Sequence, residues 1–192
     1  MDTVIKHKSL IMWLAVVVWL GIIAVTFWWF EFRVNRQIDF TQEHVFDSRK
    51  LSDDLLLMKQ GSTGITVIHY FDDACPCTKF NSSHVLDLMN RYEQKDVYFL
   101  ILAADMSSKI KAEKIFNRPV TIAESSEVPV ASPSAVVINN GEVSYIGPYS
   151  PGAVCSTAAG DFVGLVLNDL LAKQPFKQAV NLASGCFCDW PV

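Results

Sequence analysis

Two cysteines, Cys75 and Cys77, stand one residue apart where a strand-like run gives way to a helix-like one. The run before them, Ile65–Phe71, is rich in β-branched and aromatic residues, which is typical of a buried strand. A cysteine at the start of a helix lies among backbone N–H groups that have no intrahelical partner, at the positive end of the helix dipole. That position favours the thiolate, the form that attacks disulfides and binds metals.

The two cysteines are predicted to act as a redox pair. Cys75 lies nearer the helix start and is the expected attacking thiol, with Cys77 as the resolving thiol. A disulfide across Pro76 would be a small ring that departs from relaxed geometry, so it should be easier to reduce than a structural bond. The carboxylates of Asp72 and Asp73 oppose thiolate formation. A structural or inert pair is the alternative.

The elements that position this pair begin with a membrane anchor. Leu10–Phe30 contains no charged residue, and its 21 residues span about 30 Å as a helix, the thickness of a bilayer's hydrocarbon core. We expect a single span, with residues 1–9 as a cytoplasmic tail and residues 31–192 in a bacterial periplasm. A cleaved signal peptide is disfavoured, because the run is too long and ends without a small-residue cleavage site.

Composition and net charge indicate which classes of partner the protein is expected to bind. The net charge is −4 and no basic patch is visible, which argues against nucleic acid. Five cysteines agree with an oxidising compartment. We therefore expect an envelope protein that carries a thiol or disulfide, and the lipid of the inner membrane, as partners. No cofactor is predicted.

The outer part reads as a connector (31–45), a domain (46–175) and a cysteine-containing tail (176–192). Residues 41–60 have helical character, with Ser52 as the expected N-cap of the part over 53–60. Apolar periodicity, caps and turn residues also predict helices over 77–92, 107–117 and 161–172, strands over 65–71 and 97–102, and a hairpin over 132–146. This order predicts an α/β fold with a mixed central sheet flanked by helices. Phe80 is placed on the apolar face of its helix, His69 inside a strand and His84 on a helix surface.

The order of elements and the place of the cysteines resemble the thioredoxin superfamily over roughly residues 46–172. Pro76-Cys77-Thr78-Lys79-Phe80 is similar to that family's Pro-Cys-Lys-x-Phe, and Pro133 and Asn140-Gly141-Glu142 have the spacing of its cis-proline and turn. The resemblance implies a thioredoxin-like fold in which Pro133 faces the cysteines and Ser132 offers its backbone to a substrate peptide. Ala74 falls where that family has its nucleophile, so standard thioredoxin activity is not implied.

The whole pattern is also similar to an uncharacterised family of membrane-anchored proteobacterial thioredoxin-like proteins with a Cys-Pro-Cys motif, a likeness that brings a fold but no activity. On a thioredoxin-like fold, Cys155 lies in a loop at the same end of the sheet as the first pair. The tail is long enough to return to that end, at ~3.3 Å per extended residue. Cys186 and Cys188 can then pair with Cys155 as a structural disulfide, or reach the first pair and relay electrons.

The sequence thus predicts a membrane-anchored periplasmic thiol–disulfide oxidoreductase-like protein, in which Cys75 and Cys77 react and Pro133 positions the partner. One alternative is a non-catalytic, disulfide-stapled interaction module of an envelope complex. The other is thiolate binding of Zn²⁺, Cu(I) or an iron–sulfur cluster. The four candidate ligands of that alternative are Cys75, Cys77, Cys186 and Cys188.

Overall fold

The structure is a computed structural model of the 192-residue chain. It describes residues 2–33, 35–39, 64–123, 131–150, 160–174, 182–186 and 188–190. The predicted helical stretch over 41–60 and Cys155 lie outside these residues. Contacts divide the chain into two units, residues 1–36 and 37–192, which we describe separately.

The first unit is the helix α1 (Asp2–Arg33). Its segment Ile11–Phe32 is long and apolar enough to cross a membrane. The Thr26 hydroxyl donates a hydrogen bond to the Ile22 carbonyl at 2.7 Å, so this polar group is satisfied within the helix. The helix continues past the predicted span of 10–30 into the predicted connector.

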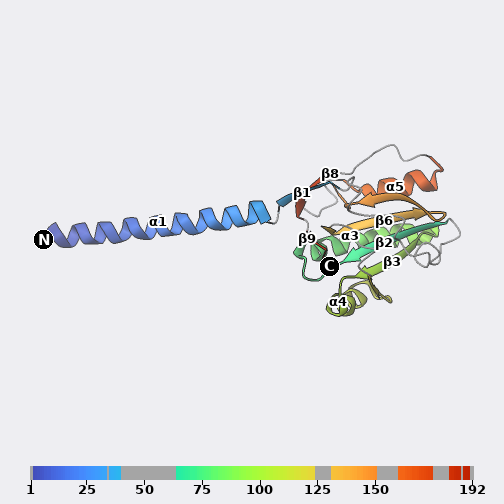
Figure 1. Cartoon of the computed structure of the whole chain (residues 1–192), viewed down its shortest axis with the longest axis horizontal. Coiled ribbons are helices and arrows are strands. Elements are labelled where there is room, and N and C mark those ends of the chain that lie inside the picture. Colours follow the sequence, from blue (N-terminus) through green and yellow to red (C-terminus); the bar gives the residue numbers. More distant parts are fainter. Residues whose placement is uncertain are drawn as a thin grey trace. The chain divides into compact units, whose positions relative to one another are not determined.

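The second unit is built on a mixed sheet of five strands (Figure 1). The strands lie in the order β4-β3-β2-β6-β7. Strands β2 and β3 pair in parallel, as do β3 and β4, whereas β6 is antiparallel to both β2 and β7. Their bounds are β2 (Ile65–Phe71), β3 (Tyr98–Ala103), β4 (Thr121–Ile122), β6 (Ser134–Asn139) and β7 (Glu142–Gly147).

In the part of the domain that the structure describes, three helices connect and flank these strands: α3 (Pro76–Tyr92), α4 (Met106–Phe116) and α5 (Phe162–Leu171). A short 3₁₀ helix, η2 (Glu93–Lys95), follows α3. Asp105 caps α4 by accepting from the Ser108 N–H at 2.7 Å, and Asp161 caps α5 by accepting from the Gly164 N–H at 2.8 Å. Asn140 and Gly141 both take positive φ in the β6–β7 turn, as a tight hairpin requires. The predicted α/β fold, a mixed central sheet flanked by helices, is confirmed.

The three inner strands, β2, β3 and β6, are buried along nearly their whole length, which agrees with their mainly apolar runs. In β2, Val67 and Phe71 belong to a large cluster that also includes side chains of α3, α4 and α5. Ile68 and Tyr70 belong to a smaller cluster on the opposite face, which includes Trp190 of the tail. His69 is fully buried, as predicted for a strand residue.

Two helix residues differ from the sequence expectation. The buried face of α3 runs through Cys77, Asn81, His84, Leu88 and Tyr92, and this places Phe80 on the outside, 72% exposed. His84 is therefore buried rather than on the surface, with its Nε2 3.4 Å from an Asp161 oxygen. Residues three or four positions apart share a helix face, and on the buried face of α3 this spacing includes His84 and leaves Phe80 outside.

The tail contributes strands that no local pattern predicted. Strand β9 (Cys188–Asp189) pairs antiparallel with β5 (Ala131–Ser132), and β8 (Leu182–Cys186) pairs with β1 (Asn35–Asp39). Each of these short strands pairs with a segment far away in the sequence. The returning tail brings Cys188 to the end of the sheet where α3 begins.

Candidate functional site

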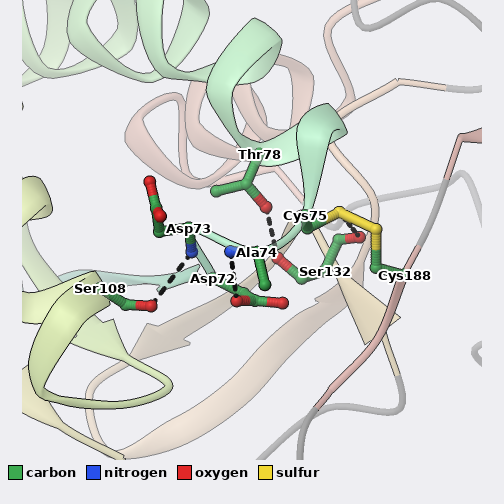
Figure 2. The surroundings of a disulfide bond; sticks show 8 residues. All are labelled: Asp72, Asp73, Ala74, Cys75, Thr78, Ser108, Ser132 and Cys188. Carbon is green, nitrogen blue, oxygen red and sulfur yellow. Dashed lines mark hydrogen bonds between the residues drawn. A yellow bond between two sulfur atoms is a disulfide. The ribbon is translucent and has the colours of Figure 1, made fainter.

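Cys75 occupies the N-cap position of α3, directly after the turn that follows β2 (Figure 2). Its backbone is extended, with φ −85° and ψ 114°, and its N–H donates to the Asp72 carbonyl at 3.2 Å. Pro76 is the first helical residue, where its missing N–H costs no hydrogen bond. The Cys75 side chain is fully buried and makes no capping hydrogen bond. The sequence correctly anticipated a sulfur at the polarised start of a helix.

Cys75 is bonded to Cys188, a residue 113 positions later in the chain, with the two Cα atoms 5.7 Å apart (Figure 2). The bond confirms the expectation that a tail cysteine reaches the first pair. It differs from two other expectations, a Cys75–Cys77 disulfide and a Cys155–Cys188 disulfide. The reason lies in the tail. Antiparallel pairing sets Cys188 opposite Ser132, directly beside the Cys75 sulfur.

Ser132 of β5 contacts both Cys75 and the first turn of α3. The Cys75 sulfur lies 3.6 Å from the Ser132 carbonyl oxygen. A disulfide sulfur carries no proton, so this approach becomes a hydrogen bond only when Cys75 is a thiol. The Ser132 hydroxyl also shares a 2.7 Å hydrogen bond with the Thr78 hydroxyl in the first turn of α3. Pro133 follows through a cis peptide bond, as the resemblance implied.

Cys77 belongs to the same sulfur cluster. It is buried, and the sulfurs of Cys75, Cys77 and Cys188 all lie within 4.8 Å of one another. Cys77 is also disulfide-bonded in this structure. Of the remaining candidates, Cys186 is described only as a backbone position in β8, and Cys155 lies outside the described residues. The structure therefore brings together three of the five cysteines named from the sequence.

The Asp72 carboxyl is held in the turn before Cys75. It is 5% exposed, and its Oδ1 accepts the Ala74 N–H at 2.9 Å (Figure 2). Burial raises the pKa of Asp72, and the hydrogen bond from Ala74 offsets only part of that rise. The carboxylate is thus more easily neutralised than a surface aspartate.

Asp73 has cationic partners instead. Its carboxylate pairs with Lys111 of α4 and, at 3.7 Å, with Lys79 of α3, and its backbone N–H donates to the Ser108 hydroxyl at 3.1 Å. These lysines offset its repulsion of a thiolate at Cys75. Sequence reasoning found both aspartates but missed Lys111, Ser108 and Thr78. No signal near the cysteines marks Lys111 and Ser108, which come from a different helix.

Comparisons with known proteins identify a family and a fold. The family described as "Domain of unknown function (DUF6436)" matches residues 42–190. Among curated proteins, no sequence matches this chain. An uncharacterised conserved protein from Geobacillus kaustophilus is similar in structure, with a TM-score of 0.57 at 20% identity, over 70% of this chain and 82% of the other.

Two further solved structures are similar to this chain. A hypothetical protein from Sinorhizobium meliloti 1021 has a TM-score of 0.54 at 10% identity, over 68% of this chain and 81% of the other. A thiol:disulfide interchange protein of the thioredoxin family from Chlorobium tepidum has a TM-score of 0.41 at 16% identity, over 57% of this chain and 81% of the other. The similarity to the first two structures shows the fold alone, and it says nothing of the chemistry of the cysteine site.

Proposed function

This chain belongs to the DUF6436 family, and we propose that it is a membrane-anchored thiol–disulfide oxidoreductase in which Cys75 exchanges disulfides with a partner. The observation that carries the proposal is the Cys75–Cys188 disulfide at the N-terminus of α3. A helix N-terminus stabilises the thiolate that leaves when this bond is reduced. The third sulfur of the cluster, Cys77, lies close enough for exchange to pass among the three.

The proposed step balances in atoms and electrons. The Cys75 thiolate attacks one sulfur of a partner disulfide, forms a mixed disulfide and releases the partner's other sulfur as a thiolate, which takes up a proton. The thiolate of Cys188 or Cys77 then attacks the Cys75 sulfur and releases the first partner sulfur. The partner gains two electrons and two protons, and the protein's two thiols become a disulfide. In the reverse direction the protein oxidises a partner dithiol.

Ser132 and Pro133 are proposed to position the partner. The Ser132 carbonyl oxygen, 3.6 Å from the Cys75 sulfur, can accept a hydrogen bond from the Cys75 thiol. The location is part of the same proposal: α1 anchors the protein in the bacterial inner membrane with the N-terminus in the cytoplasm, and the domain meets an envelope protein in the periplasm. An oxidising compartment is where disulfides form and persist.

The test uses the reduced full-length protein in detergent, with oxidised glutathione as the disulfide. We expect Cys188→Ser to accumulate a glutathione adduct on Cys75, detected by mass mapping, because one resolving thiol is gone. The Cys77→Ser variant reports whether the third sulfur also resolves the adduct. Cys75→Ser should form no adduct near the start of α3. Adducts of equal yield in Cys75→Ser and Cys188→Ser would contradict the assignment of Cys75.

A second candidate, thiolate metal binding, is favoured by the spacing of the three sulfurs. Thiolates on one zinc ion lie about 3.8 Å apart, given Zn–S distances of about 2.3 Å, and the three sulfurs here all lie within 4.8 Å of one another. The cysteines would have to be reduced first, because a disulfide sulfur is not a thiolate ligand. Metal analysis of protein purified under reducing conditions, compared with Cys75→Ser, tests this candidate.

A further inference from the structure

Three of the contacts that the structure describes hold residues 188–190 of the C-terminal tail at the sulfur site. Cys188 is bonded to Cys75, the backbones of Cys188 and Asp189 pair with β5, and the Trp190 ring meets Tyr70 edge-on at 5.5 Å. Trp190 is only 5% exposed, although it is the last described residue of the chain. The segment is therefore seated on the domain through a covalent bond, a backbone ladder and an aromatic contact.

The seated segment has a simple pattern. Asp189 is exposed, whereas Trp190 is buried and the Cys188 sulfur is bonded to the buried Cys75. This is the alternation of an extended strand, in which residues two positions apart face the same side. The site on the domain accordingly accepts a cysteine and, two residues later, an aromatic side chain, with an outward residue between them.

Without its disulfide the segment is weakly held. The β5–β9 ladder has only two residue pairs and forms a sheet of its own, and so small a ladder does not persist unaided in water. Reduction of Cys75–Cys188 removes this covalent link. It leaves the β5–β9 ladder, the Trp190 contact and, earlier in the tail, the pairing of β8 with β1. An added strand of similar chemistry can then compete for the same edge by pairing with β5.

This inference rests on the proposed function. We propose that the protein's own segment 188–190 fills, in the oxidised state, the site at which the partner binds. The partner is an extended segment with a cysteine and an aromatic residue two positions later. In the reduced protein the partner's segment replaces the tail and pairs with Ala131 and Ser132. Its disulfide sulfur then lies beside Cys75, and its aromatic ring packs against Tyr70. After Cys75 has formed the mixed disulfide, the returning tail brings the Cys188 thiolate to the Cys75 sulfur and expels the partner as a thiol.

The test uses reduced full-length Cys188→Ser protein in detergent and an activated disulfide peptide. The probe is acetyl-Gly-Cys-Asp-Trp-amide with its cysteine joined to an aromatic thiol whose release is followed optically. The matched control peptide has alanine in place of tryptophan, and a small symmetrical aromatic disulfide reports the reactivity of Cys75 alone. We expect the tryptophan peptide to react at least fivefold faster than the alanine peptide. Removing the tail's own ring, in Cys188→Ser/Trp190→Ala, should increase that difference.

A second measurement uses the unaltered chain, so it does not depend on how the variants fold. The same peptide with serine in place of cysteine is added in excess to the reduced protein during reoxidation by oxidised glutathione. It should slow the closure of Cys75–Cys188 severalfold, and the alanine version should not. Equal rates for the two peptides in both experiments would overturn the proposal while leaving exchange at Cys75 intact. Failure of Cys75 to react with the small disulfide would instead overturn the proposed function, and this inference with it.

Discussion

The hydroxyls of Thr78 and Ser132 lie 2.7 Å apart and join the first turn of α3 to strand β5. Both residues are fully buried, and 54 positions separate them in the sequence. The bond therefore fixes the helix that carries Cys75 against the strand edge that receives the tail. This hydrogen bond joins α3 to β5, whereas the Cys75–Cys188 disulfide joins the start of α3 to the tail.

The first prediction concerns this hydroxyl pair. Ser132→Ala should lower the free energy of unfolding by about 1–2 kcal/mol, because it leaves the buried Thr78 hydroxyl without this partner. The double variant Ser132→Ala/Thr78→Val should lose less unfolding free energy than the sum of the losses in the two single variants, because neither hydroxyl of this pair is then left without its partner. A double-mutant cycle by urea denaturation measures this coupling. Additive effects would show that the two hydroxyls do not interact.

The second prediction concerns the covalent link. A cross-link over 113 residues restricts the unfolded chain strongly. In the chain-entropy account, opening it lowers the free energy of unfolding by roughly 4–5 kcal/mol. Cys188→Ser should therefore unfold at a clearly lower urea concentration than the oxidised wild type. When both proteins are in dithiothreitol, which opens every disulfide, their midpoints should be about equal. A Cys188→Ser midpoint equal to that of the oxidised wild type would contradict this assignment.

The third prediction is a pH dependence from His69. This histidine is fully buried, and its Nδ1 shares a 2.8 Å hydrogen bond with the Tyr149 hydroxyl. Burial lowers the pKa of His69 from 6.5 to about 3, so between these values the unfolded chain binds a proton that the folded protein does not. Stability should fall as the pH drops from about 6.5 toward 3, with a contribution of about 3 kcal/mol from this residue near pH 4.

The matched variant is His69→Gln, which keeps hydrogen-bonding atoms but cannot titrate. Its unfolding free energy should change less between about pH 6.5 and pH 4 than that of the wild type. Parallel curves for the two proteins, measured by urea denaturation at a series of pH values, would show that His69 is not the titrating group.

The fourth prediction concerns Asp72 and the reactivity of Cys75. A carboxylate in the turn before the helix disfavours the thiolate. Asp72→Asn removes this charge and should lower the pKa of the Cys75 thiol, which is measured as the pH at which alkylation of the reduced protein reaches half its maximal rate. Asp87→Asn, on the exposed side of α3, is the control and should leave that pH unchanged. An unchanged profile in Asp72→Asn would mean that its carboxyl is already neutral.

Much of the scaffold could be predicted from local signals. The β-branched run Ile65–Phe71 became β2 with these same bounds, and the Asn140-Gly141 turn formed the predicted hairpin. Each of these elements is specified by residues that are neighbours in the sequence: apolar runs, caps and turn residues. The starts of α3, α4 and α5 were also predicted to within one residue, and this placed Cys75 next to a helix N-terminus.

The partner of Cys75 was not predictable in the same way. Cys188 reaches it because β9 pairs with β5, and ladders of two residues leave no periodic signal in a sequence. The burial of Trp190 against Tyr70 and the pairing of Lys111 with Asp73 also join segments far apart in the chain. The length of the tail shows that it can return to this end of the sheet, but only tertiary structure selects which sulfur it meets.

The most direct measurement is a redox titration of the full-length protein against glutathione buffers, with the Cys75–Cys188 bond followed by mass mapping after alkylation. A disulfide that exchanges with partners should open reversibly at a potential between about −120 and −270 mV, the range of known thiol–disulfide catalysts. A bond that stays closed below about −300 mV would be a permanent staple of the tail, and exchange at Cys75 would not be the function of this site.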